Sequence, residues 1–573
     1  MINKKIMSYL EVLDKDTERT TGGQVRRYNL LAVRMIKDLV INSFGPLGKE
    51  KIYIDIIGES ILTKDGATFL RKIDVGHPAA KVLIDASTTV DNEVGDGTTS
   101  VVIITGSLLE KAEELLEKNI SQATISNGYD IGLKLSLELL EDISRKVSNK
   151  DITIIEKLAK TCLGTKVITQ NDQYEINKIA EITVNAIKTI YDYDNNTLDV
   201  DDIKIEEKIG NTYDSQLING ILIDKTIDNN SMPKHLENAN VLLLDEDLEL
   251  KRTKTDAEIC ANSPIHMQLF FKEEKAIIQS KIQNIIDSGT NVVISRKGID
   301  LNAQSYLAKA GIMSIRRVKE NDLLWLEKAT GGKIIKELNF SELKENLGYA
   351  GKVFEKLVGE DKMVFIEECQ SPKSVTILLR ANSKMILDEY HRAVLSAIIL
   401  IKSFISKPSI VMGAGSSEAL IAHYIRKKSL EYSGREQIVL IKFAEALEEI
   451  PMTLAKNSGM NVIDSLIQFK TKLSKNSSDK NMALFGINIL NKNVEELNWD
   501  IIEPSIVKEQ VLNTAIEVSR LLLNVDDVLI KKPLMNTHTH EDGTEHSHEG
   551  GEKKHDHYFD RLGKLQRPSH HYY

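Results

Sequence analysis

The chain has 573 residues, of which 42% are hydrophobic and 28% are charged, and its formal net charge is −10 at pH 7. This length exceeds what one hydrophobic core supports, so a globular protein of about two to four domains is expected. The negative charge argues against a nucleic-acid partner, because proteins that displace counterions from phosphate chains need a basic face.

Cysteine usage and the lack of long apolar segments indicate the compartment. The three cysteines, Cys162, Cys260 and Cys369, lie far apart and form no CxxC pair. This spacing predicts neither a structural zinc site nor a disulfide framework, and it fits a reducing compartment. Residues 1–20 lack the apolar stretch of a signal peptide, and no apolar run reaches the roughly 20 residues that cross a bilayer. We therefore expect a cytoplasmic protein with no membrane partner.

The first part of the chain is predicted to be mainly helical. Residues 24–43 carry apolar side chains at helical spacing. The alternating isoleucines of KIYIDIIGESILT, residues 51–63, predict a hairpin with a turn at IGES. A long helix is predicted to begin after Asp96, and two more at 123–147 and 153–162.

The middle of the chain has a different pattern. Between residues 220 and 370, short apolar runs such as VLLLD, NVVIS and MVFIEE alternate with helical stretches, which is typical of a mixed α/β domain. Beyond residue 380 the pattern is helical again. This order predicts a discontinuous helical domain whose two halves pack together, with an α/β domain inserted between them.

The last segment, residues 534–573, is polar and holds eight of the thirteen histidines. Its composition predicts a disordered tail. Its HxH pairs would bind Ni²⁺, Cu²⁺ or Zn²⁺ weakly; they are His538/His540, His546/His548 and His555/His557. A soluble tail with incidental metal affinity is favoured over a metal-buffering function, because that function would rest on the tail alone.

Four short glycine-containing segments form one chemical set: FGPLG (44–48), TKDGAT (63–68), GDGTTS (95–100) and MGAGS (412–416). Each places glycine beside a predicted helix, where bare backbone N–H groups approach an anion. Asp96 would be out of place beside a phosphate unless a cation such as Mg²⁺ lay between them. Taken singly, GDGTTS is equally a helix N-cap after a tight turn, and TKDG is an ordinary turn signature.

Longer motifs decide between these alternatives. EVGDGTTS, TKDGAT followed by HPAAK, and GREQIVLIKFAEALEEIPMTLAKNSG resemble the group II chaperonins, the thermosome of archaea and its eukaryotic cytosolic relative. So do GIDLNAQSYLAKAGIMSIRRV, KATGGKII and VGEDKMVFIEEC. The resemblance runs from Thr17 to Pro533 in family order, and the middle segments are closer to the archaeal type.

The resemblance implies a multidomain α+β fold with three domains. They are a mainly helical, discontinuous equatorial domain (1–150 and 409–533), a small α/β intermediate domain (151–219 and 369–408) and an inserted α/β apical domain (220–368). A helical protrusion is expected near 252–280, where Ile265, Leu269, Phe270 and Phe271 would be either exposed contact residues or the core of one more helix. Homologous subunits in a homo- or hetero-oligomeric double ring, and unfolded client proteins, are the implied partners.

The resemblance also implies ATP or ADP with Mg²⁺ as cofactors, and it assigns roles residue by residue. Asp96 becomes the metal ligand, Asp65 orients the attacking water, Lys166 senses the γ-phosphate and Glu503 meets the ribose or adenine. The remaining nucleotide contacts are Gly45, Pro46, Gly66, Gly97, Thr98, Thr99, Ser100, Gly413 and Gly415.

One departure from the family pattern bears on hydrolysis. Where the family reads roughly ERALEDAL, this chain reads HRAVLSAI, and Ser396 stands at the position of a second hydrolytic aspartate. A hydroxyl cannot deprotonate water as a carboxylate does, and losing such a group costs about 10²–10⁴ in rate. Asp388 and Glu389 lie about 10–12 Å away along the helix and are not expected to substitute. We predict a chaperone subunit that binds ATP–Mg but hydrolyses it weakly; the alternative is a non-hydrolysing structural or regulatory subunit of a mixed ring.

Other departures lie at the same segments. Leu47 stands where a lysine or polar residue is usual, and Lys64 where asparagine is frequent. Ala414 replaces a glycine, which adds a methyl group where the backbone has to approach the nucleotide or adopt positive φ. These changes leave the metal ligand and the phosphate loop in place.

Overall fold

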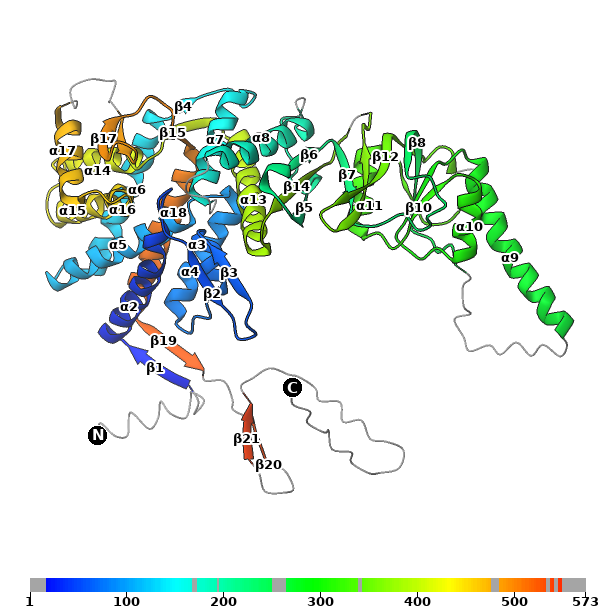
Figure 1. Cartoon of the computed structure of the whole chain (residues 1–573). Helices are drawn as coiled ribbons and strands as arrows, with labels where there is room; N and C mark the ends of the chain where they lie inside the picture. The colour runs from blue at the N-terminus through cyan, green and yellow to red at the C-terminus, as the bar shows by residue number, and fades with distance from the viewer. Residues whose placement is uncertain are drawn as a thin grey trace. The chain divides into compact units, whose positions relative to one another are not determined.

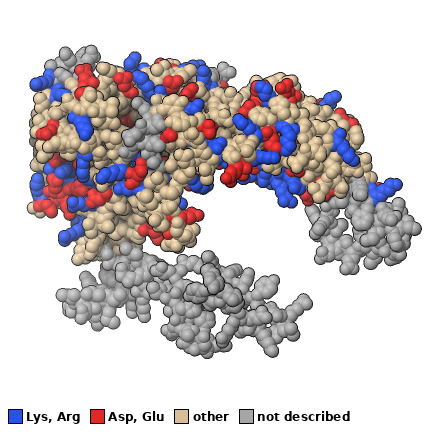
Figure 2. All heavy atoms as spheres, in the orientation of Figure 1, with Lys and Arg blue, Asp and Glu red and all other residues tan. Residues whose placement is uncertain are grey.

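The computed structural model describes residues 17–166, 173–192, 195–249, 264–338, 343–370, 372–475, 484–531, 536–539 and 545–548. The protein has a multidomain α+β fold (Figure 1). By their internal contacts the residues form two compact units, one made of 1–28 with 524–573 and the other of 29–523. Figure 2 shows acidic and basic side chains interspersed over the face in view. Among the described helices, none has the length and apolar character needed to cross a membrane.

The first unit joins the two ends of the chain. Strand β1 (Thr17–Thr21) pairs antiparallel with β19 (Asp527–Lys531), with Thr17 opposite Lys531. The tail contains β20 (Asn536–Thr539) and β21 (Glu545–His548), which pair antiparallel and place His538 opposite His546. The prediction of a disordered tail therefore differs from the structure at these two strands, and the other tail residues, including His540, His555 and His557, lie outside the described residues.

The next elements along the chain are mainly helices, the first of which continues from the first unit into the second. They are α2 (Gly23–Val40), the 3-10 turn η1 (Ile41–Ser43), α3 (Gly66–Lys72), α4 (Pro78–Val94), α5 (Thr98–Glu117), α6 (Gln122–Ile143), α7 (Ile152–Lys166) and α8 (Gln173–Ile190). Between η1 and α3 the predicted hairpin forms from β2 (Lys51–Ile54) and β3 (Ser60–Thr63). The apolar spacing predicted α2, α5, α6 and α7, whereas α3, α4 and α8 were not predicted. Along α5, residues 101–104 are all fully buried, because this helix runs through the core instead of lying on the surface.

The middle of the chain folds around a seven-stranded sheet with strand order β10-β9-β8-β12-β13-β7, and β11 pairs with β8. Its elements are β7 (Gly220–Ile223), β8 (His235–Leu244), α9 (Pro264–Asp287), β9 (Val292–Ser295), α10 (Leu301–Lys309), β10 (Met313–Ile315), α11 (Glu320–Thr330), β11 (Ile334–Ile335), β12 (Gly348–Val358) and β13 (Asp361–Glu367). Strands β8, β9 and β10 are parallel, and the others on the path are antiparallel. The sheet has its own hydrophobic core, drawn from residues 221–369.

Part of the protrusion predicted from the resemblance cannot be compared with the structure. Residues 250–263 lie outside the described residues, as do the side chains of Ile265, Leu269, Phe270 and Phe271. The described part begins with helix α9 at Pro264, and the side chain of Ile277 on this helix is 57% exposed.

The remaining elements return the chain to the helical core. A three-stranded sheet consists of β5 (Ile203–Ile209), β14 (Val375–Ala381) and β6 (Gln216–Ile218). It joins chain segments that precede the central sheet in the sequence to one that follows it. It is followed by α13 (Lys384–Ser406), β15 (Ser409–Met412), α14 (Ser416–Ser429), α15 (Arg435–Leu447), α16 (Glu449–Asn457), α17 (Val462–Lys475), β16 (Phe485–Asn488), β17 (Asn493–Glu496), β18 (Ile502–Pro504) and α18 (Ser505–Asn524). Strand β15 lies between β18 and β4 (Arg145–Lys146). One core contains buried residues of both 33–203 and 375–523, so the two helical stretches pack together. The exact domain limits stay a prediction.

Candidate functional site

One pocket collects segments that are hundreds of residues apart in the sequence. It has a volume of about 450 Å³ and is lined by residues of all four glycine-containing segments, together with α7, α16 and the β16–β18 region. The predicted site residues among its lining are Gly45, Pro46, Asp65, Gly66, Asp96, Gly97, Thr98, Thr99, Ser100, Lys166, Gly415 and Glu503. Two predicted residues, Gly413 and Ser396, are not part of the lining.

The N-terminus of α5 opens into this pocket because two glycines permit a tight approach. Helix α4 ends at Gly95 (φ 73°) and α5 begins at Gly97 (φ 90°), both in the left-handed region. A Cβ on Gly97 would lie 2.5 Å from Cγ2 of Val511, and a Cβ on Gly95 would overlap the carbonyl oxygen of Ser396. The first N–H groups of α5 have no intrahelical acceptor, so the pocket receives the positive end of the helix.

A second helix start lies beside the first. Asp65 is the N-cap of α3, and its Oδ2 accepts a hydrogen bond from the backbone N–H of Thr68 at 2.8 Å. A Cβ on Gly66 would overlap the hydroxyl of Thr99, so the first turns of α3 and α5 are in contact. Two helix N-termini at one pocket favour an anion with several oxygen atoms, such as a polyphosphate.

Lys166, at the end of α7, is surrounded by carboxylates. Its Nζ donates to the carbonyl of Gly95 at 2.9 Å and lies 3.8 Å from Asp65, 3.9 Å from Asp91 and 4.0 Å from Asp96. Burial by itself would lower the pKa of Lys166, but Asp65 and Asp96 outweigh it and hold the pKa well above its ordinary value. The ammonium group is therefore charged throughout the physiological range.

The carboxylates around Lys166 differ in how they titrate. Burial favours protonated Asp65, yet Lys166 and the hydrogen bond from Thr68 lower its pKa below the ordinary value. The pKa of Asp91 is raised above its ordinary value, because burial and the negative charge of Asp65 outweigh the effect of Lys166. Asp91 also pairs with Arg71 at 2.9 Å and does not line the pocket, so Asp65 and Asp96 are the carboxylates that face it with Lys166. Two carboxylates against one ammonium leave negative charge at the pocket wall, which a divalent cation would neutralise.

Asp96 is the carboxylate best placed to bind a metal ion. Its side chain is 26% exposed and borders the pocket, and its Oδ1 accepts from the N–H of Gly97 at 2.8 Å. No group of three or more His, Cys, Asp or Glu side chains within the described residues is arranged as a metal site by itself. A single carboxylate at the edge of the pocket suits Mg²⁺, because Mg²⁺ is commonly held by one or two carboxylates together with phosphate oxygens and water. The residues present therefore fit a magnesium–phosphate ligand.

The C-terminal half contributes the opposite wall. Oε2 of Glu503, on β18, accepts from Lys508 at 2.6 Å, and Lys508 also pairs with Glu418 at 2.8 Å. Burial raises the pKa of Glu503, Lys508 opposes this, and Glu418 adds to it. Gly413 contacts this group, since a Cβ there would lie 2.7 Å from Oε1 of Glu503. Ala414, at φ 54°, adopts the left-handed conformation that its position requires.

Ser396 lies behind the GDGTTS segment (95–100) and not in the pocket lining. Its side chain is on α13 and is 9% exposed, and its carbonyl packs against Gly95. Helix α13 thus runs directly past the loop that carries Asp96, with a hydroxyl and no carboxylate at this position.

Several lining residues were not among the predicted site residues, although Lys64 was noted from the sequence as a departure from the family pattern. Lys64, which is 3% exposed, donates from Nζ to the carbonyl of Pro46 at 2.6 Å, and burial lowers its pKa. Helix α7 adds Lys157, Lys160, Thr161 and Thr165, whose mutual spacing of three to four residues places them on one face of the helix. Lys166 lies on another face of the same helix, so its position alone does not identify this row.

The distance along the helix predicted that Glu389 is too far from position 396 to substitute for the missing aspartate. In the structure Glu389 is buried and accepts hydrogen bonds from the backbone N–H of Lys64 at 3.0 Å and the hydroxyl of Thr63 at 3.1 Å. It therefore contacts the segment that carries Asp65, although it does not line the pocket.

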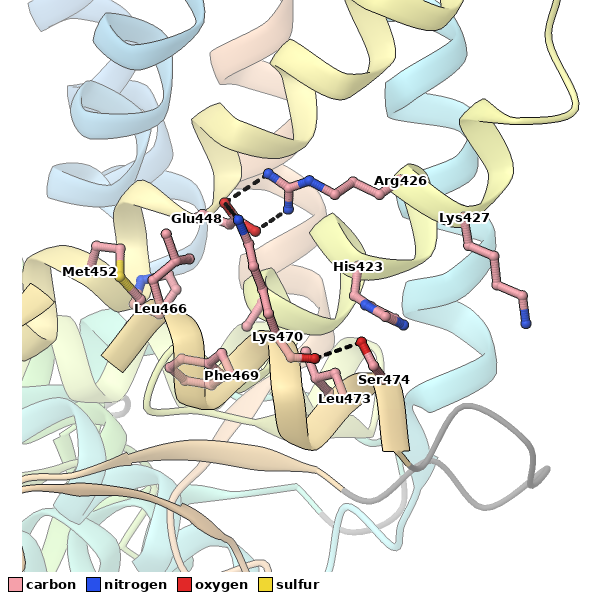
Figure 3. Close-up of a pocket in the computed structure, with 12 residues that line it drawn as sticks. His423, Arg426, Lys427, Glu448, Met452, Leu466, Phe469, Lys470, Leu473 and Ser474 are labelled. Carbon is pink, nitrogen blue, oxygen red and sulfur yellow. Dashed lines mark hydrogen bonds and ion pairs between the residues drawn. The ribbon is translucent and has the colours of Figure 1, made fainter. Parts of the chain in front are cut away.

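A second pocket, of about 370 Å³, lies between α14, α16 and α17 (Figure 3). Figure 3 shows Arg426 directed at Glu448, with which it forms a two-pronged ion pair, while Lys470 extends across the same group. None of the predicted site residues lines this pocket. Its carboxylate is already neutralised, so its chemistry differs from that of the larger pocket.

Comparison with known proteins identifies relatives of the whole chain. Residues 36–533 match the model of the TCP-1/cpn60 chaperonin family. Thermosome subunit beta of Archaeoglobus fulgidus is 39% identical over 527 residues, which cover 91% of this chain and 95% of the relative. A thermosome subunit of Methanocaldococcus jannaschii is 38% identical over 543 residues, covering 94% and 97%, and one of Pyrococcus horikoshii is 38% identical over 528 residues, covering 91% and 94%. The resemblance found in the sequence motifs is confirmed, including its archaeal character.

Proposed function

The chain belongs to the TCP-1/cpn60 chaperonin family, as a group II chaperonin subunit, and from this premise we propose that it binds ATP with Mg²⁺ in the 450 Å³ pocket and hydrolyses it slowly. One observation carries the proposal: Asp65, Asp96 and Lys166 converge at the N-termini of α3 and α5. A polyphosphate requires donors, a cation and a metal-binding carboxylate together, and this pocket offers all of them.

Each wall of the pocket has a role in this proposal. The N–H and hydroxyl groups of Thr98, Thr99 and Ser100 bind phosphate oxygens, and the ammonium groups of Lys64 and Lys166 balance their charge. Asp96 holds the metal ion, which neutralises phosphate charge when bound. The apolar side chains opposite form the surface for the base, with Glu503 beside it; they are Ile450, Leu454, Ile487 and Ile489.

Slow hydrolysis follows from the carboxylates that are available to water. Asp65 has a lowered pKa, is ionised at neutral pH and accepts a proton or orients water at the pocket wall. Ser396 contributes no second base. Glu389 cannot take its place, because its oxygens are already bonded to Thr63, Lys64 and Arg392 and it does not face the pocket. The missing base lowers the rate by about 10²–10⁴.

A chaperone subunit of this kind is proposed to consist of the equatorial, intermediate and apical domains assigned from the resemblance, and to act in the cytoplasm on unfolded clients. Exposed apolar side chains support assembly with neighbouring subunits. Ile52, Ile54 and Ile56 on the β2–β3 hairpin are 64%, 65% and 104% exposed, and Leu31 and Met35 on α2 are 54% and 60% exposed. Such exposed apolar patches mark protein–protein contacts.

Isothermal titration of the purified chain with ATP, with and without Mg²⁺, tests nucleotide binding. We expect Mg²⁺-dependent binding that is lost in Asp96→Ala and retained in the control Glu93→Gln, whose side chain is exposed and lies outside the pocket lining. Absence of ATP binding by the unaltered chain would refute the proposal.

The alternative, a structural or regulatory subunit that binds nucleotide without turnover, is favoured by the same serine at position 396. A single-turnover assay at stoichiometric protein separates the two functions, because slow hydrolysis gives a complete but delayed conversion and the alternative gives none.

A further inference from the structure

Helix α13 contacts both loops that supply the aspartates of the pocket. Near its middle, the carbonyl of Ser396 and the backbone N of Leu400 pack against Gly95, directly before Asp96. Two turns earlier, Glu389 reaches residues 63–65, directly before the first turn of α3. The helix therefore touches the site at two points that are separated along its length.

The contact at Glu389 is made by a fully engaged carboxylate. Its side chain is 1% exposed. Oε1 accepts from the N–H of Lys64 at 3.0 Å and from the hydroxyl of Thr63 at 3.1 Å, while Oε2 accepts two hydrogen bonds from Arg392 at 2.6 and 3.0 Å. A buried carboxylate destabilises a fold unless its partners are complete, and here they are complete.

From Glu389 the hydrogen bonds continue to Asp65. The hydroxyl of Thr63, which donates to Glu389, accepts from the backbone N–H of Asp65 at 3.0 Å. Lys64, whose backbone is held by Glu389, extends its ammonium group to the carbonyl of Pro46 in the pocket. Fixing residues 63–65 thus fixes the direction of two charged side chains at the phosphate end of the site.

We propose that Glu389 is a positioning residue, which locks the Thr63–Asp65 segment to α13 and so makes the orientation of Lys64 and Asp65 depend on the position of this helix. The inference rests on the nucleotide pocket proposed above. Glu389 would then connect α13 to the nucleotide. Ser396 has no carboxylate and does not make this connection.

Two measurements on Glu389→Ala test the link. Hydrogen exchange of the Lys64 and Asp65 amides without nucleotide should become faster, because their acceptors are lost or released. Affinity for Mg–ATP should fall about tenfold, as expected for one charged hydrogen bond. Affinity for Mg–ADP should fall clearly less, because the role implied for Asp65, orienting the attacking water, places this wall beside the terminal phosphate that ADP lacks.

Three further variants keep the test decisive if Glu389→Ala does not fold. Glu389→Gln retains an oxygen acceptor for Lys64 but turns N–H donors toward Arg392, so its ATP affinity should be intermediate. Thr63→Val removes the hydroxyl that links Glu389 to the backbone N–H of Asp65 and leaves Glu389 in place. As in Glu389→Ala, the affinity for Mg–ATP should therefore fall more than the affinity for Mg–ADP. Asp388→Asn is the matched control, since this neighbour is 38% exposed and interacts with Lys384, at 3.8 Å, and with Glu207 and Arg392, and not with residues 63–65; it should behave as the unaltered chain.

Unchanged exchange of both amides would overturn the proposal. So would equal losses of ATP and ADP affinity that scale with a lower melting temperature, because that result indicates a purely structural role. If the unaltered chain bound neither nucleotide, the proposed function would fail, but the exchange measurement would still decide whether Glu389 holds residues 63–65.

Discussion

The nucleotide pocket and the central seven-stranded sheet hold their parts together by opposite means. In the sheet, neighbouring strands bury mainly apolar side chains, such as Leu243 on β8 and Val293 on β9, both fully buried. In the pocket, buried Lys166 stands among three carboxylates, and buried Lys508 pairs with two. Aliphatic burial stabilises without requiring a particular partner, whereas buried charges fix one arrangement and tolerate little change. The difference separates a region built for stability from one built for chemistry.

The largest expected effect is a faster rate of ATP hydrolysis in the pocket. Ser396→Asp places a carboxylate on α13 beside Gly95, at the position where the resemblance implies a hydrolytic aspartate, and we expect ATP hydrolysis to rise by about 10²–10⁴ with little change in affinity. Single-turnover kinetics measure the rate, and titration measures the affinity. A rate that stays at the original level would show that the serine is not what limits hydrolysis.

Removing the central cation should damage both binding and folding. Lys166→Met leaves Asp65, Asp91 and Asp96 without their shared partner, and breaking a buried pair in this way costs about 3–5 kcal/mol of unfolding free energy. ATP affinity should fall at the same time, because the carboxylates then repel phosphate. Lys160→Met is the control, since Lys160 lines the same pocket but is exposed; urea denaturation and titration should show only small changes.

A substitution in the sheet should lower the unfolding free energy without changing ATP affinity. Leu243→Ala removes a fully buried side chain, which costs about 2–5 kcal/mol of unfolding free energy through lost burial and the cavity left behind. ATP affinity of the folded protein should be unchanged, because β8 contributes nothing to the pocket lining. A parallel loss of affinity would remove the distinction between the two regions.

The smallest effect concerns a surface ion pair and pH. Hydrogen bonds from Lys111 and Lys442 lower the pKa of Glu114 from 4.5 to about 2. A lowered folded-state pKa stabilises the fold above pH 4.5, and this contribution is lost as pH falls from 4.5 to 2. Because Glu114 is mostly exposed, Glu114→Gln should destabilise only slightly at pH 7 and not at all near pH 2. Denaturation curves at both values check this; an equal difference at both would contradict it.

Much of the site could be read from local sequence, because its parts are local structures. Glycines at positions 95 and 97, followed by hydroxyl residues, specify a left-handed turn into a helix start, and Asp65 specifies the N-cap of α3. The four glycine-containing segments do line one pocket, as their chemistry predicted. Helices α3, α4 and α8 were missed, and the ends of several helices differ by a few residues, since caps and neighbours set them.

What the sequence determined by itself was the set of groups on which the proposal rests: glycine-containing turns at helix starts, an aspartate between two glycines, a serine where the resemblance implies an aspartate, and helical stretches on either side of an α/β middle. The tertiary structure alone decided which distant groups meet. Lys166 is placed among Asp65, Asp91 and Asp96 by the packing of α7 beside the phosphate loop, and Glu389 reaches Lys64 because α13 crosses the end of β3. Spacing along one helix gives distances only along its axis, while hydrogen bonds between segments depend on how helices cross, and that is set by the whole core.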